Sequence, residues 1–139
     1  MSTATILNKI ACLLMKDGKK SVALRLVRKS LVLASNQLSV SEETVLWQAL
    51  GNIKPVVDAR SKKVGRMSYI IPYALTEEQS TFLAIKILVE SSRARREKQF
   101  QHKLANELTD SFHNKGSSIK KKNELYKLAE ANKSFAFFR

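Results

Sequence analysis

The sequence KPVVDARSKKVGR at residues 54–66, followed one residue later by SYIIPYAL at residues 68–75, decides the fold. Its first part carries five cations against one acid and contains several β-branched residues, and its second part supplies aromatic and branched side chains. Such runs favour paired strands, and Gly65 between them permits a tight reversal. Pro72 is compatible with this pairing because both strands of a two-stranded ribbon are edges. The stretch therefore predicts a β-ribbon with a basic tip over about residues 54–75.

The rest of the chain shows the apolar spacing of amphipathic helices. Two patterns, Ser39 with Glu42 and Thr76 with Gln79, match capping boxes at helix starts. We expect one domain over residues 1–139, mainly α, in which a bundle of about six helices carries one protruding two-stranded antiparallel β-ribbon between the third and fourth helices. The expected helices are a first ending before Gly18, a second at about 21–34, a third between Ser39 and Pro55, a fourth from Thr76 to the arginines at 93–96, a fifth at about 98–112 and a sixth from 120 to the chain end.

Four residues carry specific expectations about packing. Val22 and Phe82 fall on the predicted inward faces of the second and fourth helices. Cys12 is the single cysteine, so it has no internal disulfide partner, and its apolar neighbours predict a buried thiol. Trp47 is expected to pack against the core, with stacking on a nucleic-acid base as the alternative.

The charge of the chain points to an anionic partner. Lysine and arginine number 25 against 12 acids, which gives a net charge of +13 and a pI near 10.1. A polyanion is the expected ligand at this charge because each neutralised phosphate releases counterions. A basic face that is simply solvated is the alternative. The cations gather in the ribbon, at 93–96, at 115–122 and, more weakly, at 16–20.

Other classes of function lack a motif. The longest apolar run, residues 82–89, is too short to span a bilayer and is broken by Lys86, so no membrane partner is expected. His102 and His113 have no carboxylate pair or second cysteine around them and are expected on the surface. Glu107 and Asp110 lie one turn apart on a helix side rather than in a recognisable cleft motif. We therefore predict no catalysis, metal, cofactor or small-molecule substrate.

Four motifs give the chain a specific resemblance. They are DGKKS at 17–21, NIKPVVDARSKKVG at 52–65, LANELTDSFHNKGSSIKKK at 104–122 and LAEANKSFAFFR at 128–139. In this order, and over nearly the whole chain, the sequence resembles the universal small-subunit ribosomal protein number seven of bacterial and organellar type.

The resemblance implies a function and a set of contacts. Proteins of that family bind the 3′ major domain of small-subunit rRNA and help to assemble the subunit head, beside neighbouring head and platform proteins. The ribbon tip, with Lys62, Lys63, Val64, Gly65 and Arg66, would approach the exit-site tRNA and the mRNA. The implied RNA contacts are Lys19, Lys20, Lys54, Arg60, Lys62, Lys63, Arg66, Arg93, Arg95, Arg96, Lys115, Lys120, Lys121 and Lys122.

The sequence also departs from the family pattern. The family's basic N-terminal arm is missing, and Glu77 and Glu78 stand where an arginine pair is usual, which removes that stretch from the expected RNA contacts. Arg66 and Arg96 replace glycines that are common in the family. A shortened member suggests the small subunit of a mitochondrial ribosome, with a plastid or the bacterial cytoplasm as alternatives. A DNA- or mRNA-binding regulatory protein is the alternative function.

Overall fold

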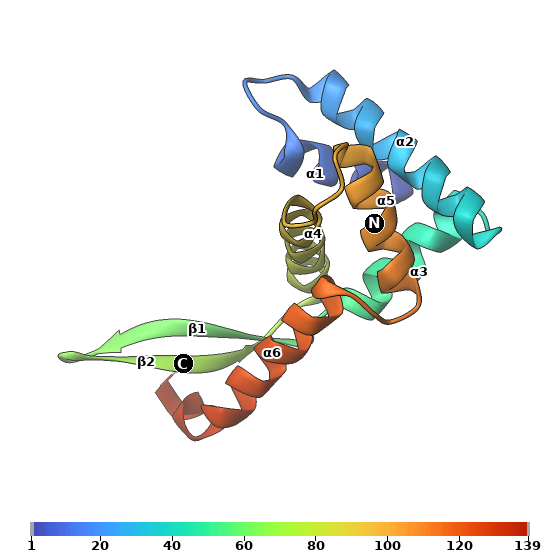
Figure 1. Cartoon of the computed structure of the whole chain (residues 1–139). Coiled ribbons are helices and arrows are strands. Elements are labelled where there is room, and N and C mark those ends of the chain that lie inside the picture. The colour runs from blue at the N-terminus through green and yellow to red at the C-terminus, as the bar shows by residue number, and fades with distance from the viewer. Residues whose placement is uncertain (1, 139) are drawn as a thin grey trace.

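The computed structural model describes residues 2–138, which form six α-helices and one two-stranded antiparallel sheet. The strands lie between the third and fourth helices, which confirms the predicted fold class (Figure 1). In chain order the elements are α1 (Thr3–Leu14), α2 (Lys20–Leu38), α3 (Glu42–Ile53), β1 (Val57–Val64), β2 (Met67–Ala74), α4 (Glu77–Arg93), α5 (Phe100–Phe112), α6 (Ser117–Ala131) and the 3₁₀ helix η1 (Lys133–Phe138).

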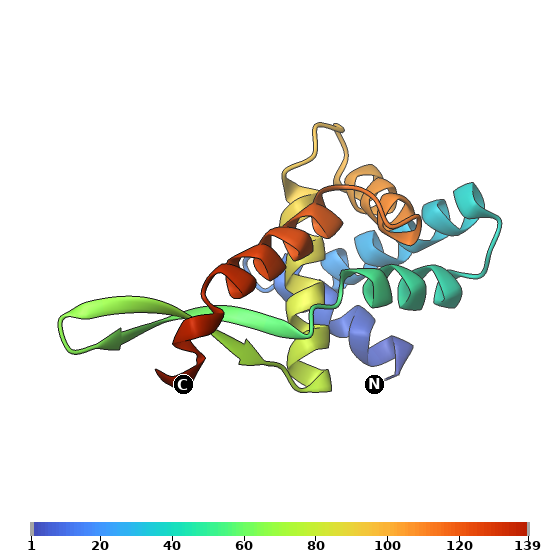
Figure 2. The ribbon, with the colours of Figure 1, turned by 90° about the horizontal axis from the view of Figure 1, so that it is seen from below.

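The first five helices share one apolar core. Helix α5 packs against α2, α3 and α4, while α1 closes the core beside α2 and α4. Helix α6 reaches this core through Ile119 near its start and then runs beside the ribbon (Figure 2). Burial of apolar surface is the main stabilising term for such a body. Its largest fully buried apolar side chains are Ile6, Ile10, Val27, Leu46, Leu50, Ile53, Ile85, Leu88, Leu104 and Leu108, and Ile71 of the ribbon is also fully buried.

The boundary between α2 and α3 differs from the prediction. Helix α2 continues to Leu38, beyond the expected end at 34, and stops where Ser39 takes a left-handed conformation with φ 57°. The cap of α3 is Ser41, whose Oγ accepts from the Thr44 N–H at 3.2 Å. The predicted capping box of Ser39 with Glu42 is therefore wrong, because Ser39 ends the preceding helix instead of opening the next.

The start of α4 follows the sequence pattern. The Thr76 Oγ1 accepts from the Gln79 N–H at 3.4 Å, and the Gln79 side chain accepts from the Thr76 N–H at 3.1 Å. This reciprocal pair confirms the second capping box.

The end of the sixth helix differs from the prediction. Helix α6 stops at Ala131, and the 3₁₀ helix η1 replaces its predicted continuation.

The ribbon pairs along its full length, from Val57 opposite Ala74 to Val64 opposite Met67. Gly65 has φ +63°, so a two-residue turn there matches the twist of the strands. Figures 1 and 2 show the ribbon extending away from the helical body, with α6 alongside its base. Tyr126 of α6 accepts a hydrogen bond from the Val56 N–H at 3.0 Å. The ribbon is therefore braced by α6 rather than isolated.

Three packing expectations are wrong and one is confirmed. Val22 and Phe82 are each 46% exposed, and the Cys12 thiol is exposed rather than buried. These side chains lie at the edges of amphipathic faces, where helical spacing alone does not decide burial. Trp47 packs against the core as expected, and its Nε1–H donates to Thr3 Oγ1 at 3.2 Å.

Truncation of Leu108 tests the core. Leu108 is only 2% exposed, so Leu108→Ala should lower the free energy of unfolding by about 2–5 kcal/mol through lost burial and a residual cavity. Leu128 is 40% exposed, and Leu128→Ala should change stability by only about 0.5 kcal/mol. Urea unfolding of both variants measures the difference, and similar losses would contradict the helix register.

Candidate nucleic-acid interface

The structure distributes the predicted cations over three regions. One is the ribbon, the second is the end of the body where the end of α4 lies beside the end of α1 and the start of α2, and the third is the start of α6. The exposed members are Lys19, Lys20, Arg60, Lys62, Lys63, Arg66, Arg93, Arg96, Lys115 and Lys120, and the half-buried members are Lys54, Arg95, Lys121 and Lys122.

The ribbon cations stand on both faces of β1. Successive side chains alternate along a strand, so Arg60 and Lys62 share one face while Lys63 lies on the other. The Arg60 guanidinium lies 5.5 Å from the Tyr73 ring centroid, and its Nε–H donates to Asp58 at 3.1 Å. Arg60 is therefore held along the ribbon, whereas Lys63 is exposed near the tip.

At the base of the ribbon, two lysines connect elements. Lys54 forms an ion pair with Glu77, and this hydrogen bond lowers the pKa of the Glu77 carboxyl. The Lys122 ammonium donates to the Asn52 carbonyl at 2.9 Å and lies 5.6 Å from the Tyr126 ring centroid. Both cations thus hold the junction between the helical body, the ribbon and α6.

A partly buried ion-pair cluster surrounds Arg95. Its Nη1 lies 2.9 Å from Glu107 Oε2 and 2.9 Å from Asp110 Oδ2, and its Nη2 lies 3.0 Å from Glu97 Oε1. Partial burial disfavours the charged guanidinium, but the three carboxylates outweigh this effect and raise the pKa of Arg95. A buried carboxylate needs such partners, since an unpaired charge in the interior is costly. Arg95 therefore joins the α4–α5 loop to α5.

The same cluster fixes the start of α6. Glu107 is fully buried, and its Oε1 accepts from the Ser118 N–H at 3.0 Å and from the Ser118 hydroxyl at 2.7 Å. Gly116 has φ +91°, and a Cβ added there would lie 3.0 Å from the Cβ of Asp110. The turn before α6 therefore requires glycine, and the adjoining lysines project from a fixed helix start. The sequence analysis did not predict that Glu107 would bind Arg95 and Ser118. The position of Glu107 one turn from Asp110, with an arginine nearby in the sequence, could have suggested an ion-pair cluster.

Two predicted clusters meet at the other end of the body. The Arg93 Nη2–H donates to the Leu13 carbonyl at 2.9 Å, which ties the end of α4 to the end of α1. The α1–α2 turn reverses through left-handed Asp17 and Gly18, and Lys19 after it lines a depression together with Arg93. Lys16 and Lys103 also line it, although neither was among the predicted contacts. Charge runs do not reveal Lys103, because it is a single cation on α5.

Helix α2 carries a further basic face. It contains no acid, and Arg25, Arg28 and Lys29 border a groove of about 650 Å³ with Val32 and Gln101. Their spacing places the three cations on one side of the helix. All three cations are exposed.

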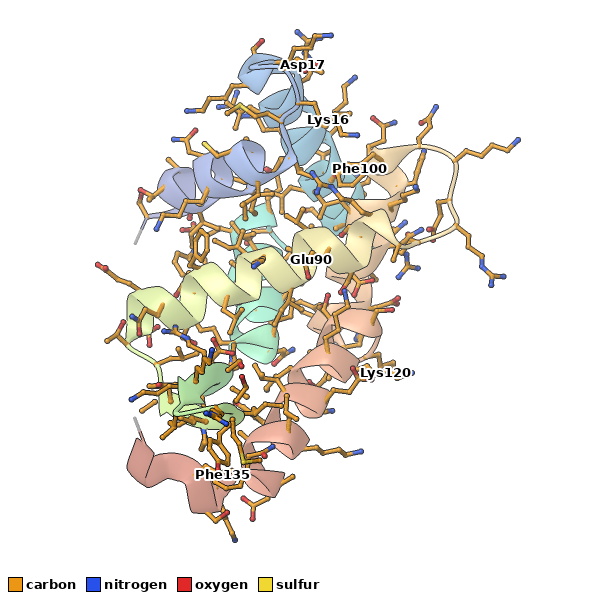
Figure 3. All side chains as sticks on the ribbon, turned by 90° about the vertical axis from the view of Figure 1, so that its left-hand side faces the viewer. Lys16, Asp17, Glu90, Phe100, Lys120 and Phe135 are labelled. Atoms are coloured by element: carbon orange, nitrogen blue, oxygen red, sulfur yellow. The ribbon has the colours of Figure 1, made fainter. Side chains whose placement is uncertain are left out.

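His102 and His113 are exposed, as predicted. Within residues 2–138 no group of three or more metal-ligating side chains comes together, and no helix in that range is long and apolar enough to cross a membrane. The exposed cations are spread over separate regions and can hold phosphates at several points. Two cations, Lys16 and Lys120, lie well apart in Figure 3.

Comparison with known proteins identifies one family. Residues 1–133 match the ribosomal protein S7p/S5e family. The small ribosomal subunit protein uS7 of Rubrobacter xylanophilus is 42% identical over 134 residues, which cover 96% of this chain and 83% of the relative. The uS7 proteins of Pelagibacter ubique and Mycobacteroides abscessus are 38% and 41% identical, over 98% and 88% of this chain and 87% and 79% of each relative.

Neutralising Glu107 tests the cluster. Glu107→Gln keeps the shape but removes the charge that pairs with Arg95, so the free energy of unfolding should fall by about 1.5–3 kcal/mol. Glu130→Gln is the matched control, because its ion pair with Lys133 is exposed and should contribute less than about 1 kcal/mol. Equal losses in urea unfolding would contradict a structural role for the buried carboxylate.

Acid should weaken the same cluster through Glu97. Hydrogen bonds from Arg95, its own backbone and Asn106 lower the pKa of Glu97 from 4.5 to about 2. A carboxylate whose pKa is lowered by folding stabilises the folded state fully at pH values above its pKa in the unfolded chain. This contribution disappears as the pH falls from about 4.5 to about 2. Melting temperatures of wild type and Glu97→Gln should differ at pH 6 and converge near pH 2. A constant difference would contradict the assignment.

Proposed function

The chain belongs to the ribosomal protein S7p/S5e family, and on this premise we propose that it binds the 3′ major domain of small-subunit rRNA and helps to assemble the subunit head. A structural role in the small ribosomal subunit, and thereby in translation, follows from membership of the family. The proposal adds the RNA domain and the assembly step.

One observation carries the proposal: exposed cations occupy three separate regions of a scaffold that buried contacts hold fixed. Lys19, Lys63 and Lys120 represent these regions. Contacts to phosphates at several points set the position and orientation of a protein on folded RNA. With a net charge of +13, counterion release supplies a large share of the binding free energy.

The proposed contacts keep the predicted set, although three of its members, Lys54, Arg95 and Lys122, also hold elements of the protein together. Arg95 is engaged by three carboxylates, so its effect on RNA binding would act through the position of α6. The ribbon tip at 62–66 extends beyond the helical body, which supports the proposal that it reaches the exit-site tRNA and the mRNA. Neighbouring head and platform proteins are the proposed protein partners.

The proposed location is the small subunit of a ribosome. We assign the chain first to a mitochondrial ribosome, with a plastid or the bacterial cytoplasm as the alternatives. The relatives named above are bacterial. The absence of catalysis and of a cofactor stays a prediction. A DNA- or mRNA-binding regulatory protein is the alternative function, and nucleic-acid preference distinguishes the two.

The test compares affinities for a transcript of the rRNA 3′ major domain and for duplex DNA at several salt concentrations. The transcript should be preferred, and the chain should co-sediment with small subunits. Lys62→Gln with Lys63→Gln should reduce the slope of log affinity against log salt by about 1.4–1.8, at about 0.7–0.9 per lost phosphate contact. Melting temperature should hardly change, because both lysines are exposed.

Lys86→Gln is the control for this experiment, because Lys86 is exposed on α4 outside the proposed contacts. Its salt slope should match that of wild type. Preference for duplex DNA, or a chain that never sediments with small subunits, would contradict the proposed function.

A further inference from the structure

We propose that the depression between the α1–α2 turn, the end of α4 and the start of α5 binds one unpaired nucleotide of the RNA, with the base on its apolar floor and the flanking phosphates on its lysine rim. This inference rests on the proposed function. The depression has a volume of about 540 Å³, within the range of about 300–1,000 Å³ for small-molecule sites.

The floor of the depression is apolar and accessible. Met15 is 37% exposed and Val22 is 46% exposed, although both are large apolar side chains. Phe100, the first residue of α5, lines the same depression and packs against the core with part of its surface. Exposed apolar side chains that gather in one depression are typical of a binding site.

The rim of the depression is basic. Lys16, Lys19, Arg93 and Lys103 line it, and they come from the α1–α2 turn, α4 and α5. Among the residues that line it, none is acidic. The bond from Arg93 to the Leu13 carbonyl fixes one side of the rim. Figure 3 shows Lys16 on the turn and Phe100 at the start of α5 at the same end of the helical body.

Floor and rim together favour an unpaired nucleotide over other ligands. Duplex RNA would present phosphates to the lysines, but its stacked bases would leave the floor empty. An apolar side chain of a neighbouring protein would cover the floor but leave the four cations without anions. An extruded base can stack on the apolar side chains of the floor while the phosphates of its nucleotide and of the next one contact the lysines of the rim. An unpaired nucleotide therefore fits both the floor and the rim.

Substitution of Val22 tests the floor. Val22→Ser should weaken binding to the rRNA 3′ major-domain transcript about threefold to fivefold, a fraction of the effect of losing one stacked base. The salt slope should stay constant, because no charge is removed. Phe82→Ser is the matched control, since Phe82 is also 46% exposed but lies on α4 outside the proposed contacts and does not line the depression. It should leave affinity unchanged.

Substitution of the rim and cross-linking complete the test. Lys16→Gln with Lys103→Gln should lower the salt slope by about 1.4–1.8. In assembled small subunits, benzoylphenylalanine in place of Val22 should form a photo-adduct with an unpaired rRNA nucleotide. An adduct with a neighbouring protein, or equal affinities for Val22→Ser and Phe82→Ser, would overturn this inference and leave the proposed function standing. A wild-type chain that does not bind the transcript would overturn both.

Discussion

The buried carboxylate of Glu107 is the constraint on which the basic surface depends. A charge with no solvent exposure must find partners inside the protein, and here Arg95 and Ser118 supply them. These partners come from the α4–α5 loop and from the start of α6, so one carboxylate joins three segments. The effect reaches further, because α6 also provides Tyr126, which accepts from the Val56 N–H at the base of the ribbon. The buried contacts of Glu107 therefore help to set the position of the ribbon, because they hold α6 in place.

The sequence predicted those features that local chemistry decides. The ribbon, the six helices and the capping box at Thr76 follow from residue type and spacing, and the structure confirms them. Ser39 shows the limit, because two nearby serines both fit a cap and only the backbone conformation selects Ser41. Val22 and Phe82 were misplaced because an amphipathic pattern defines a face but not its edges, which depend on where neighbouring helices end.

Prediction of the site had a different limit. Charge runs identify lysines that are neighbours in sequence, such as Lys120 and Lys121. They do not show which cations are already engaged in ion pairs or hydrogen bonds within the protein. Arg95 belongs to the same run as Arg93 and Arg96, yet three carboxylates hold it. Conversely, Lys103 is a single cation in sequence and reaches the interface only because α5 starts beside α2.

The cations of this chain therefore divide between two tasks that depend on each other. Those at the junctions of elements, Arg95, Lys54 and Lys122, bond to carboxylates or carbonyls and set the relative positions of the helices, the ribbon and α6. Exposed cations such as Lys19 and Lys63 can then meet phosphates at positions fixed before binding. Fixed positions reduce the conformational entropy lost on binding. A strongly basic surface would otherwise repel itself, and the carboxylates around Arg95 offset this repulsion where the segments converge. Three of the twelve acids in the chain, Glu97, Glu107 and Asp110, thus meet at a point where the geometry of the proposed RNA-binding surface is set.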